Sequence, residues 1–146
     1  MIYCTDGKRH LICVPYSVEN LHEMAQHLGI KKSWYHPSPR PHYDVPKRRT
    51  EEIRTRCVSI SSTELVRIQI GISPIGRHAR VKSSHHLFGQ TSVPENFVGR
   101  IVWADTKTRR VTISVDLYQL SNTLDGDWDF DTVFSDIEIL ENKEEV

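Results

Sequence analysis

The sequence predicts an α+β protein, in which a small α/β unit is followed by a small antiparallel β-barrel or sandwich. Before residue 70 helical and strand-like patterns alternate, whereas every later periodic stretch has a period of two. Gly71, Pro74 and Gly76 interrupt the chain between the two patterns. The 146 residues suffice for two small units. The predicted parts are an α/β domain at 1–69, a β-barrel at 74–141 and an acidic tail at 142–146.

The first half begins with a predicted β-hairpin and an amphipathic helix. Residues 1–5 and 10–14 are strand-forming segments on either side of a turn at Gly7. Ser17 is a favourable N-cap for a helix over 18–28, whose apolar residues fall on one stripe, and a glycine follows to end it. This helix is the best-defined element that the sequence predicts.

Further elements follow a proline-rich segment. Pro46 is a favourable first-turn residue for a surface helix over 46–57. Ser61 and Glu64 have capping-box spacing before a short apolar helix. The second half then contains four segments that predict strands, at 77–82, 97–104, 110–117 and 137–140, with a hairpin turn at 105–108.

The segment 34–49 is the predicted functional surface. It combines aromatic, histidine and basic residues, and its prolines at 37, 39 and 41 favour a rigid exposed loop over helix or central strand. Residues 31–56 carry eight Lys or Arg against three acids. An anion is therefore the expected ligand. The candidate ligand-binding residues are Trp34, Tyr35, Arg40, His42, Tyr43, Asp44, Lys47 and Arg48.

The leading hypothesis is that this loop binds nucleic acid or a phosphorylated nucleotide. Trp34 and Tyr35 offer flat faces for base stacking, and the basic residues offer phosphate contacts. The alternative is structural: Trp34 and Tyr43 would pack the loop onto the first helix, and the basic residues would only be solvated. Seven basic residues against two acids in the strands at 77–110 could extend a polyanion track.

A second hypothesis is a small hydrolase or nuclease with a His/Asp centre. His42, Asp44 and His22 are the candidate catalytic residues, and His10, Tyr43 and Lys47 are further acid–base groups. His42 and Asp44 would point the same way from an extended segment, but two ligands are too few for a metal site. We therefore predict no metal and no cofactor.

A third hypothesis is an inhibitor that binds a host protein. Residues 116–146 carry ten acids against one Lys, and Asp125–Asp131 alternates Asp with Trp128 and Phe130. This strip could dock a basic partner or imitate nucleic acid. Alternatively, Trp128 and Phe130 cover the core of the barrel. Separately, His85-His86 is interpreted as a loop and not as a metal ligand.

The cysteine content and the hydropathy indicate the cellular compartment in which the protein is expected. Cys4, Cys13 and Cys57 are odd in number and include no CxxC pair, so we expect buried thiols and no disulfide. The sequence has no long apolar run and no leader-like start. We therefore expect a cytoplasmic protein that does not associate with membranes. The oligomeric state is not predicted.

Several residues of the first half carry a resemblance to a known family. They are Tyr3, His10-Leu11, Leu21-His22-x-x-Ala25, Gly29, Trp34, Pro41-His42-Tyr43-Asp44 and Lys47-Arg48. With these, residues 1–68 resemble small bacterial and phage proteins known only as domain of unknown function 4031. The resemblance implies a phage or bacterial accessory protein and brings no established activity. Thr5 and Val14 stand where acids are expected, which argues against a metal-dependent active site.

The second half resembles a small SH3-like barrel. The segments that carry this resemblance are 76–81, 97–102 and 134–140, as its opening, second and closing strands. Barrels of this kind are appended to nucleic-acid-binding and protein-binding chains. The resemblance therefore implies an accessory binding role.

Overall fold

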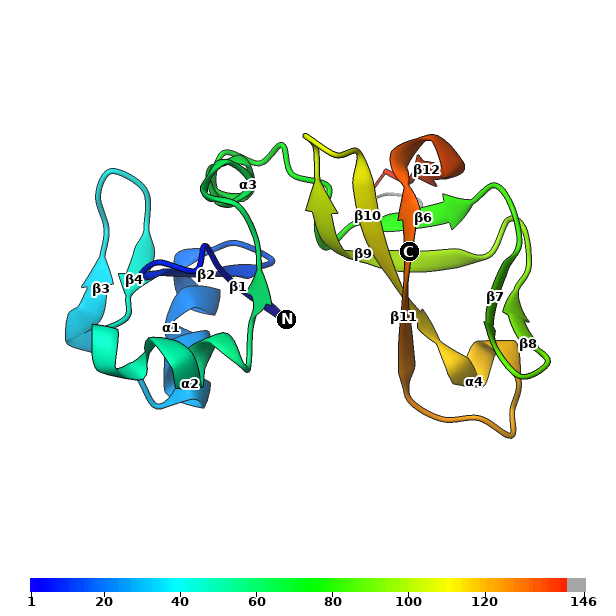
Figure 1. Cartoon of the computed structure of the whole chain (residues 1–146). Coiled ribbons are helices and arrows are strands. Elements are labelled where there is room, and N and C mark those ends of the chain that lie inside the picture. The colour runs from blue at the N-terminus through cyan, green and yellow to red at the C-terminus, as the bar shows by residue number, and fades with distance from the viewer. Residues whose placement is uncertain (142–146) are drawn as a thin grey trace. The chain divides into compact units, whose positions relative to one another are not determined.

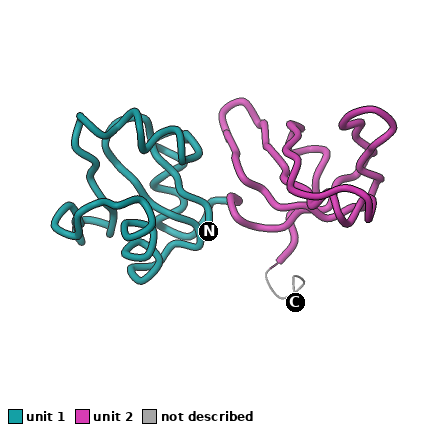
Figure 2. Tube along the Cα trace, turned by 90° about the horizontal axis from the view of Figure 1, so that it is seen from below, with its two compact units in different colours: residues 1–73 teal, residues 74–146 magenta. Residues whose placement is uncertain are grey.

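The computed structural model describes residues 1–141 and divides the chain into two compact units. Unit 1 comprises residues 1–73 and unit 2 begins at Pro74, as Figure 2 shows in separate colours. The predicted acidic tail at 142–146 lies outside the described residues. Helices and several sheets are present, which confirms the α+β class.

Unit 1 is built on a five-stranded sheet with helices on both faces. The strand order is β3 (Tyr35–His36), β4 (His42–Asp44), β2 (His10–Val14), β1 (Ile2–Thr5) and β5 (Val58–Ser59). All pairings are antiparallel except that of β1 with β5. Figure 1 shows α1 (Val18–Leu28) and α2 (Thr50–Arg54) on one face of the sheet and α3 (Ser62–Gln69) on the other.

Helix α1 matches the prediction in both its ends and its buried face. The Ser17 side chain accepts a hydrogen bond from the Asn20 amide, and Gly29 ends the helix with φ of 66°. The buried residues of the helix lie on the predicted apolar stripe: Leu21, Met24, Ala25 and Leu28. Burying this stripe against the sheet stabilises unit 1 through the hydrophobic effect.

The predicted loop at 34–49 follows a 3-10 turn at Lys32–Trp34 and consists of a hairpin and a second 3-10 turn at Lys47–Arg49. Strands β3 and β4 pair with each other, and Pro37, Pro39 and Pro41 lie in the connection between the strands. The helix predicted over 46–57 is shorter: a 3-10 turn at Lys47–Arg49 precedes α2, which ends at Arg54. Ile53 is the one residue of these two elements that is buried, so little apolar burial supports a longer helix.

Unit 2 contains an open antiparallel sheet. Its strand order is β11 (Asp127–Val133), β10 (Arg110–Asp116), β9 (Val98–Asp105), β6 (His78–Val81) and β12 (Ile137–Ile139). Strands β7 (His85–Phe88) and β8 (Thr91–Val93) form a separate pair, and α4 (Leu117–Leu120) follows β10. The pairings among the described strands do not close a barrel.

The helices carry no membrane span. Among the described residues, none forms a helix that is both long enough and apolar enough to cross a bilayer.

Candidate functional site

The strand register gathers four polar side chains on one face of the unit 1 sheet. His36 pairs with His42 across β3 and β4, and His10 pairs with Asp44 across β2 and β4. Directly paired residues of antiparallel strands share a face, and so do residues two apart on one strand. His10, His36, His42 and Asp44 therefore project together, on the face that carries α3.

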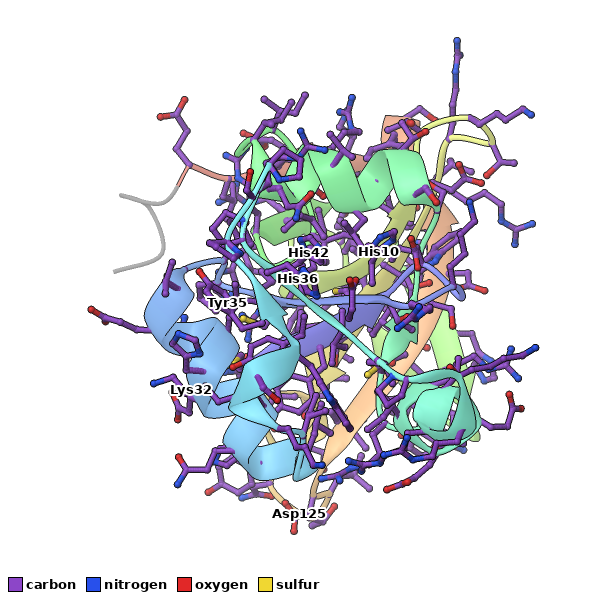
Figure 3. The ribbon with its side chains drawn as sticks, turned by 90° about the vertical axis from the view of Figure 1, so that its left-hand side faces the viewer. His10, Lys32, Tyr35, His36, His42 and Asp125 are labelled. Atoms are coloured by element: carbon purple, nitrogen blue, oxygen red, sulfur yellow. The ribbon has the colours of Figure 1, made fainter. Side chains whose placement is uncertain are left out.

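Asp44 is at the centre of this histidine–aspartate cluster, which comprises His10, His36, His42 and Asp44. Its Oδ1 lies 3.3 Å from His42 Nε2 and 3.9 Å from His10 Nε2. Its Oδ2 lies 3.1 Å from His36 Nε2. The rings of His36 and His42 stack with centroids 5.4 Å apart. Figure 3 shows the three labelled histidines close together on their strands.

Hydrogen bonds fix the orientation of two of the imidazoles. His42 Nδ1 donates to the Arg40 carbonyl oxygen at 2.7 Å, and His10 Nδ1 lies 2.7 Å from Asp6 Oδ2. Burial opposes ionisation of Asp6, but hydrogen bonds from the His10 ring and the Lys8 amide outweigh it and lower the pKa of that carboxyl. The Asp6 carboxylate is thus an acceptor, and Nε2 of each ring is directed toward Asp44.

One oxygen of this cluster is buried without a hydrogen-bond partner. Asp44 Oδ1 is inaccessible to solvent and accepts no hydrogen bond from the described residues. His10, His42 and Asp44 place one ligand atom each within 4.8 Å of one another, close enough to share a metal ion. The sequence placed only His42 and Asp44 together, and the pairing of β2 with β4 adds His10 to them.

A pocket of about 280 Å³ adjoins the cluster. His10 and His42 form part of its wall, and the loops at 6–8 and 39–40 and helix α3 complete it. Arg40 Nε donates to Gln69 Oε1 at 3.1 Å, and Gln69 Nε2 donates to the Pro41 carbonyl oxygen at 3.3 Å. These bonds hold the hairpin loop against α3. The lining residues are Asp6, Lys8, His10, Pro39, Arg40, His42, Ser62, Leu65, Val66 and Gln69.

Tyr43 and His22 lie on the opposite face of the sheet. Tyr43 alternates with His42 and Asp44 on β4, is fully buried, and lies 2.7 Å from His22 Nδ1 through its hydroxyl. The His22 ring also packs on Tyr35, with centroids 4.7 Å apart. The structure therefore joins His42 and Asp44 but separates His22 from them. It also removes Tyr43 from the surface that a ligand could reach.

Trp34 forms a second, separate group with basic residues. Lys31 Nζ and the Arg48 guanidinium each lie 5.9 Å from the centroid of the indole ring. Lys47 is exposed on the same 3-10 turn as Arg48. None of the aromatic or basic residues of this group lines the pocket, whereas Arg40 does. The predicted continuous surface is thus divided between the pocket side and the Trp34 side of unit 1.

The acidic segment of unit 2 is a strand that carries aromatic contacts. Strand β11 lies at the edge of its sheet. Trp128 packs on Phe88 with centroids 4.6 Å apart, and Phe130 packs on His85 at 4.7 Å. The structural interpretation places both aromatic residues over the core of unit 2. Here they contact residues of β7, and Trp128 is 41% exposed. His85 is in β7 and hydrogen-bonds Asp136, so the predicted loop at His85-His86 was wrong.

The sequence analysis did not assign His36, Asp6 or Lys8 to the site. The available signal was the alternation of His42 and Asp44 on one strand, which defines a face. Completing that face requires the partner residues on β2 and β3, and these depend on register.

Together, the sheet and its histidine–aspartate cluster define a small α/β unit with a polar site on one face. A family model described as protein of unknown function (DUF4031) matches residues 8–71 of the chain. The match confirms the resemblance found in the sequence and includes all four residues of the cluster. Comparison with curated proteins and with solved structures found no match.

Proposed function

We propose that unit 1 binds a phosphorylated nucleotide, free or at the end of a nucleic-acid strand, in the pocket beside the cluster. The observation that carries this proposal is the charge of the wall. Lys8 and Arg40 supply two cations, and His10 and His42 supply two further polar rings. Asp6 is the one acid in the lining, and its carboxylate is already engaged by His10. A phosphate group would complement this wall.

The remainder of the lining suits the base and sugar of a nucleotide. Pro39, Leu65 and Val66 provide apolar surface, while Ser62 and Gln69 provide hydrogen-bonding groups. A volume of about 280 Å³ is near the lower end of small-molecule sites, which run from roughly 300 to 1,000 Å³. One nucleotide is therefore a better fit than an extended duplex. Trp34 with Arg48 remains a candidate surface for the continuation of a strand.

The direct test is calorimetric titration of the whole chain with ADP, with adenosine as the phosphate-free comparison. We expect ADP to bind and adenosine to bind at least tenfold more weakly, because Lys8 and Arg40 contact the phosphates. Arg40→Ala combined with Lys8→Ala should abolish ADP binding. Lys107→Ala, in a turn of unit 2, removes one positive charge away from the pocket and should leave the ADP affinity unchanged. Equal affinity in the double variant and the wild type would refute the proposal.

A second candidate function is hydrolysis of a phosphoester in the same pocket. It is favoured by the Asp6–His10 pair, in which a carboxylate orients an imidazole on the pocket wall. Turnover of bis(p-nitrophenyl) phosphate by the wild type, and its loss in His10→Gln with ADP binding retained, would support this function. Binding of ADP without turnover of bis(p-nitrophenyl) phosphate would show that the pocket binds a nucleotide but does not hydrolyse a phosphoester.

The proposal also includes the role of unit 2 and the cellular compartment of the protein. We infer that unit 2 is an SH3-like accessory module, supported by its five antiparallel strands and by the predicted opening, second and closing segments. The three free cysteines support a reducing compartment such as the cytoplasm. A bacterial or phage accessory role is part of the proposal and rests on the resemblance of residues 1–68 alone.

A further inference from the structure

We propose that His10, His42 and Asp44 bind a divalent transition-metal ion of the Zn²⁺ class. The site is built by unit 1 alone and does not require that the neighbouring pocket bind a nucleotide. Its ligand atoms are Nε2 of the two histidines and Oδ1 of the aspartate.

The first argument is that three acceptor atoms converge on one point. His42 Nδ1 must be a donor, because its partner is the Arg40 carbonyl oxygen. His10 Nδ1 donates to the Asp6 carboxylate in the same way. This arrangement directs the Nε2 atoms of both rings at Asp44 Oδ1, a buried oxygen that has no hydrogen-bond donor among the described residues. A shared cation satisfies all three atoms at once.

The second argument is distance. Zinc binds imidazole nitrogen and carboxylate oxygen at about 2.0–2.2 Å, so neighbouring ligand atoms in a tetrahedral site lie about 3.3 Å apart. His42 Nε2 lies 3.3 Å from Asp44 Oδ1, and His10 Nε2 lies 3.9 Å from it. All three ligand atoms lie within 4.8 Å of one another. Side-chain movements of up to about 1.5 Å would bring all three atoms to the spacing of a tetrahedral site.

The third argument is the support behind each ligand. Asp6 orients His10, the Arg40 carbonyl orients His42, and His36 Nε2 lies 3.1 Å from the second oxygen of Asp44. Histidine ligands of metals usually donate their other ring nitrogen to a carboxylate or a carbonyl, and ligating carboxylates are held in turn. All three supports are present here. The Asp6 side chain is only 2% exposed, whereas the His10 side chain that it orients is 46% exposed.

The ligand set selects the class of ion. Two imidazoles and one carboxylate suit Zn²⁺, Fe²⁺, Co²⁺ or Ni²⁺, whereas Mg²⁺ and Ca²⁺ prefer oxygen ligands. Three protein ligands leave at least one coordination position open. Because His10 and His42 also line the pocket, the proposed ion would lie at its wall. The ion could therefore hold a water molecule or a phosphate oxygen there.

The test is titration of the metal-stripped whole chain with ZnCl₂, followed by calorimetry, with MgCl₂ as the comparison ion. We expect one Zn²⁺ per chain and at least 100-fold weaker binding of Mg²⁺. Asp44→Asn retains the shape of the side chain, and it should weaken Zn²⁺ binding at least 100-fold. His42→Gln should do the same. His86→Gln is the matched control and should leave the affinity unchanged, because His86 belongs to unit 2.

X-ray absorption at the zinc edge of the loaded wild type gives a readout that does not depend on variants. The expected first shell contains only nitrogen and oxygen, with two imidazoles. A shell with sulfur would assign the ion to the cysteines and overturn the proposal. Absence of stoichiometric Zn²⁺ binding by the folded wild type would also overturn it, as would a folded Asp44→Asn variant that binds Zn²⁺ with wild-type affinity.

Discussion

His42 Nε2 lies 3.3 Å from Asp44 Oδ1, and that oxygen is buried without a hydrogen-bond partner among the described residues. The two residues are two apart on β4, so the pleat of the strand alone places them on the same face. His10 joins them from β2, the next strand of the sheet. A short edge hairpin thus supplies most of the candidate site.

Replacing Asp6 should weaken the metal site without removing a ligand. Asp6→Asn retains the size of the side chain but loses the charged acceptor that orients His10. Loss of such a support typically lowers metal affinity by about 10–100-fold, so we expect a reduction of that size in a Zn²⁺ titration. Asp125→Asn, in unit 2, should have no effect. An unchanged affinity in Asp6→Asn would show that the His10 ring needs no such support.

Removing the Tyr43 hydroxyl should cost stability but leave the cluster intact. Tyr43→Phe deletes the contact with His22 inside the core, and a neutral buried hydrogen bond contributes about 1 kcal/mol. Urea unfolding followed by circular dichroism should show this loss, and Zn²⁺ affinity should stay the same. Tyr118→Phe is the control, because Tyr118 is 61% exposed. Loss of Zn²⁺ affinity in folded Tyr43→Phe would mean that the two faces of the sheet are coupled.

The three cysteines should resist alkylation in the folded protein. Burial raises the pKa of Cys4 to about 12 and the pKa of Cys13 and of Cys57 to about 11. The reactive thiolate is therefore scarce at pH 8, and iodoacetamide should label the native chain on the order of 100-fold more slowly than the chain in urea. Mass spectrometry measures both rates. Fast native labelling of Cys57 would contradict its raised pKa.

Unit 2 should lose stability in acid through Asp136. Burial raises the pKa of this carboxyl, but hydrogen bonds from Ser83, His85 and Thr132 outweigh the effect, so the net pKa is lowered. A lowered folded pKa means that the stabilisation is complete above the unfolded value of about 3.9 and is lost as the pH falls through the folded value.

Urea unfolding at a series of pH values from 7 to 3 checks this prediction. The wild type should lose free energy of unfolding below about pH 4, and Asp136→Asn should lack this component of the loss. The variant should also be less stable at pH 7 by roughly 1–3 kcal/mol, because charged hydrogen bonds are replaced by neutral ones. Identical pH profiles for the two proteins would contradict the assignment.

The sequence predicted correctly those elements that are specified by residues close together in the chain. The predicted helix at 18–28 is α1, because cap, apolar stripe and terminal glycine all agree. The hairpin turn predicted at 105–108 is also present, between β9 and β10. The helix predicted at 46–57 was too long, because a favourable first turn does not replace the buried stripe that a surface helix needs.

The site depended on contacts that the sequence does not show. The aromatic and basic residues of 34–49 were expected on one surface, but alternation in β3 and β4 sends Tyr35 and Tyr43 to the α1 face and His36, His42 and Asp44 to the other. Only the pairing of β2 with β4 adds His10. Register between short strands is set by turns and by packing, and single-sequence patterns do not specify it here.

The most direct test of the central claim is a long-range ¹H–¹⁵N spectrum of the histidine rings, recorded on the metal-stripped whole chain before and after one equivalent of Zn²⁺. The account predicts that the Nε2 signals of His10 and His42 move to the range of metal-bound nitrogen, while both ring nitrogens of His22 and His86 stay in place. Histidine signals that remain unchanged, or changes confined to rings outside the cluster, would contradict it.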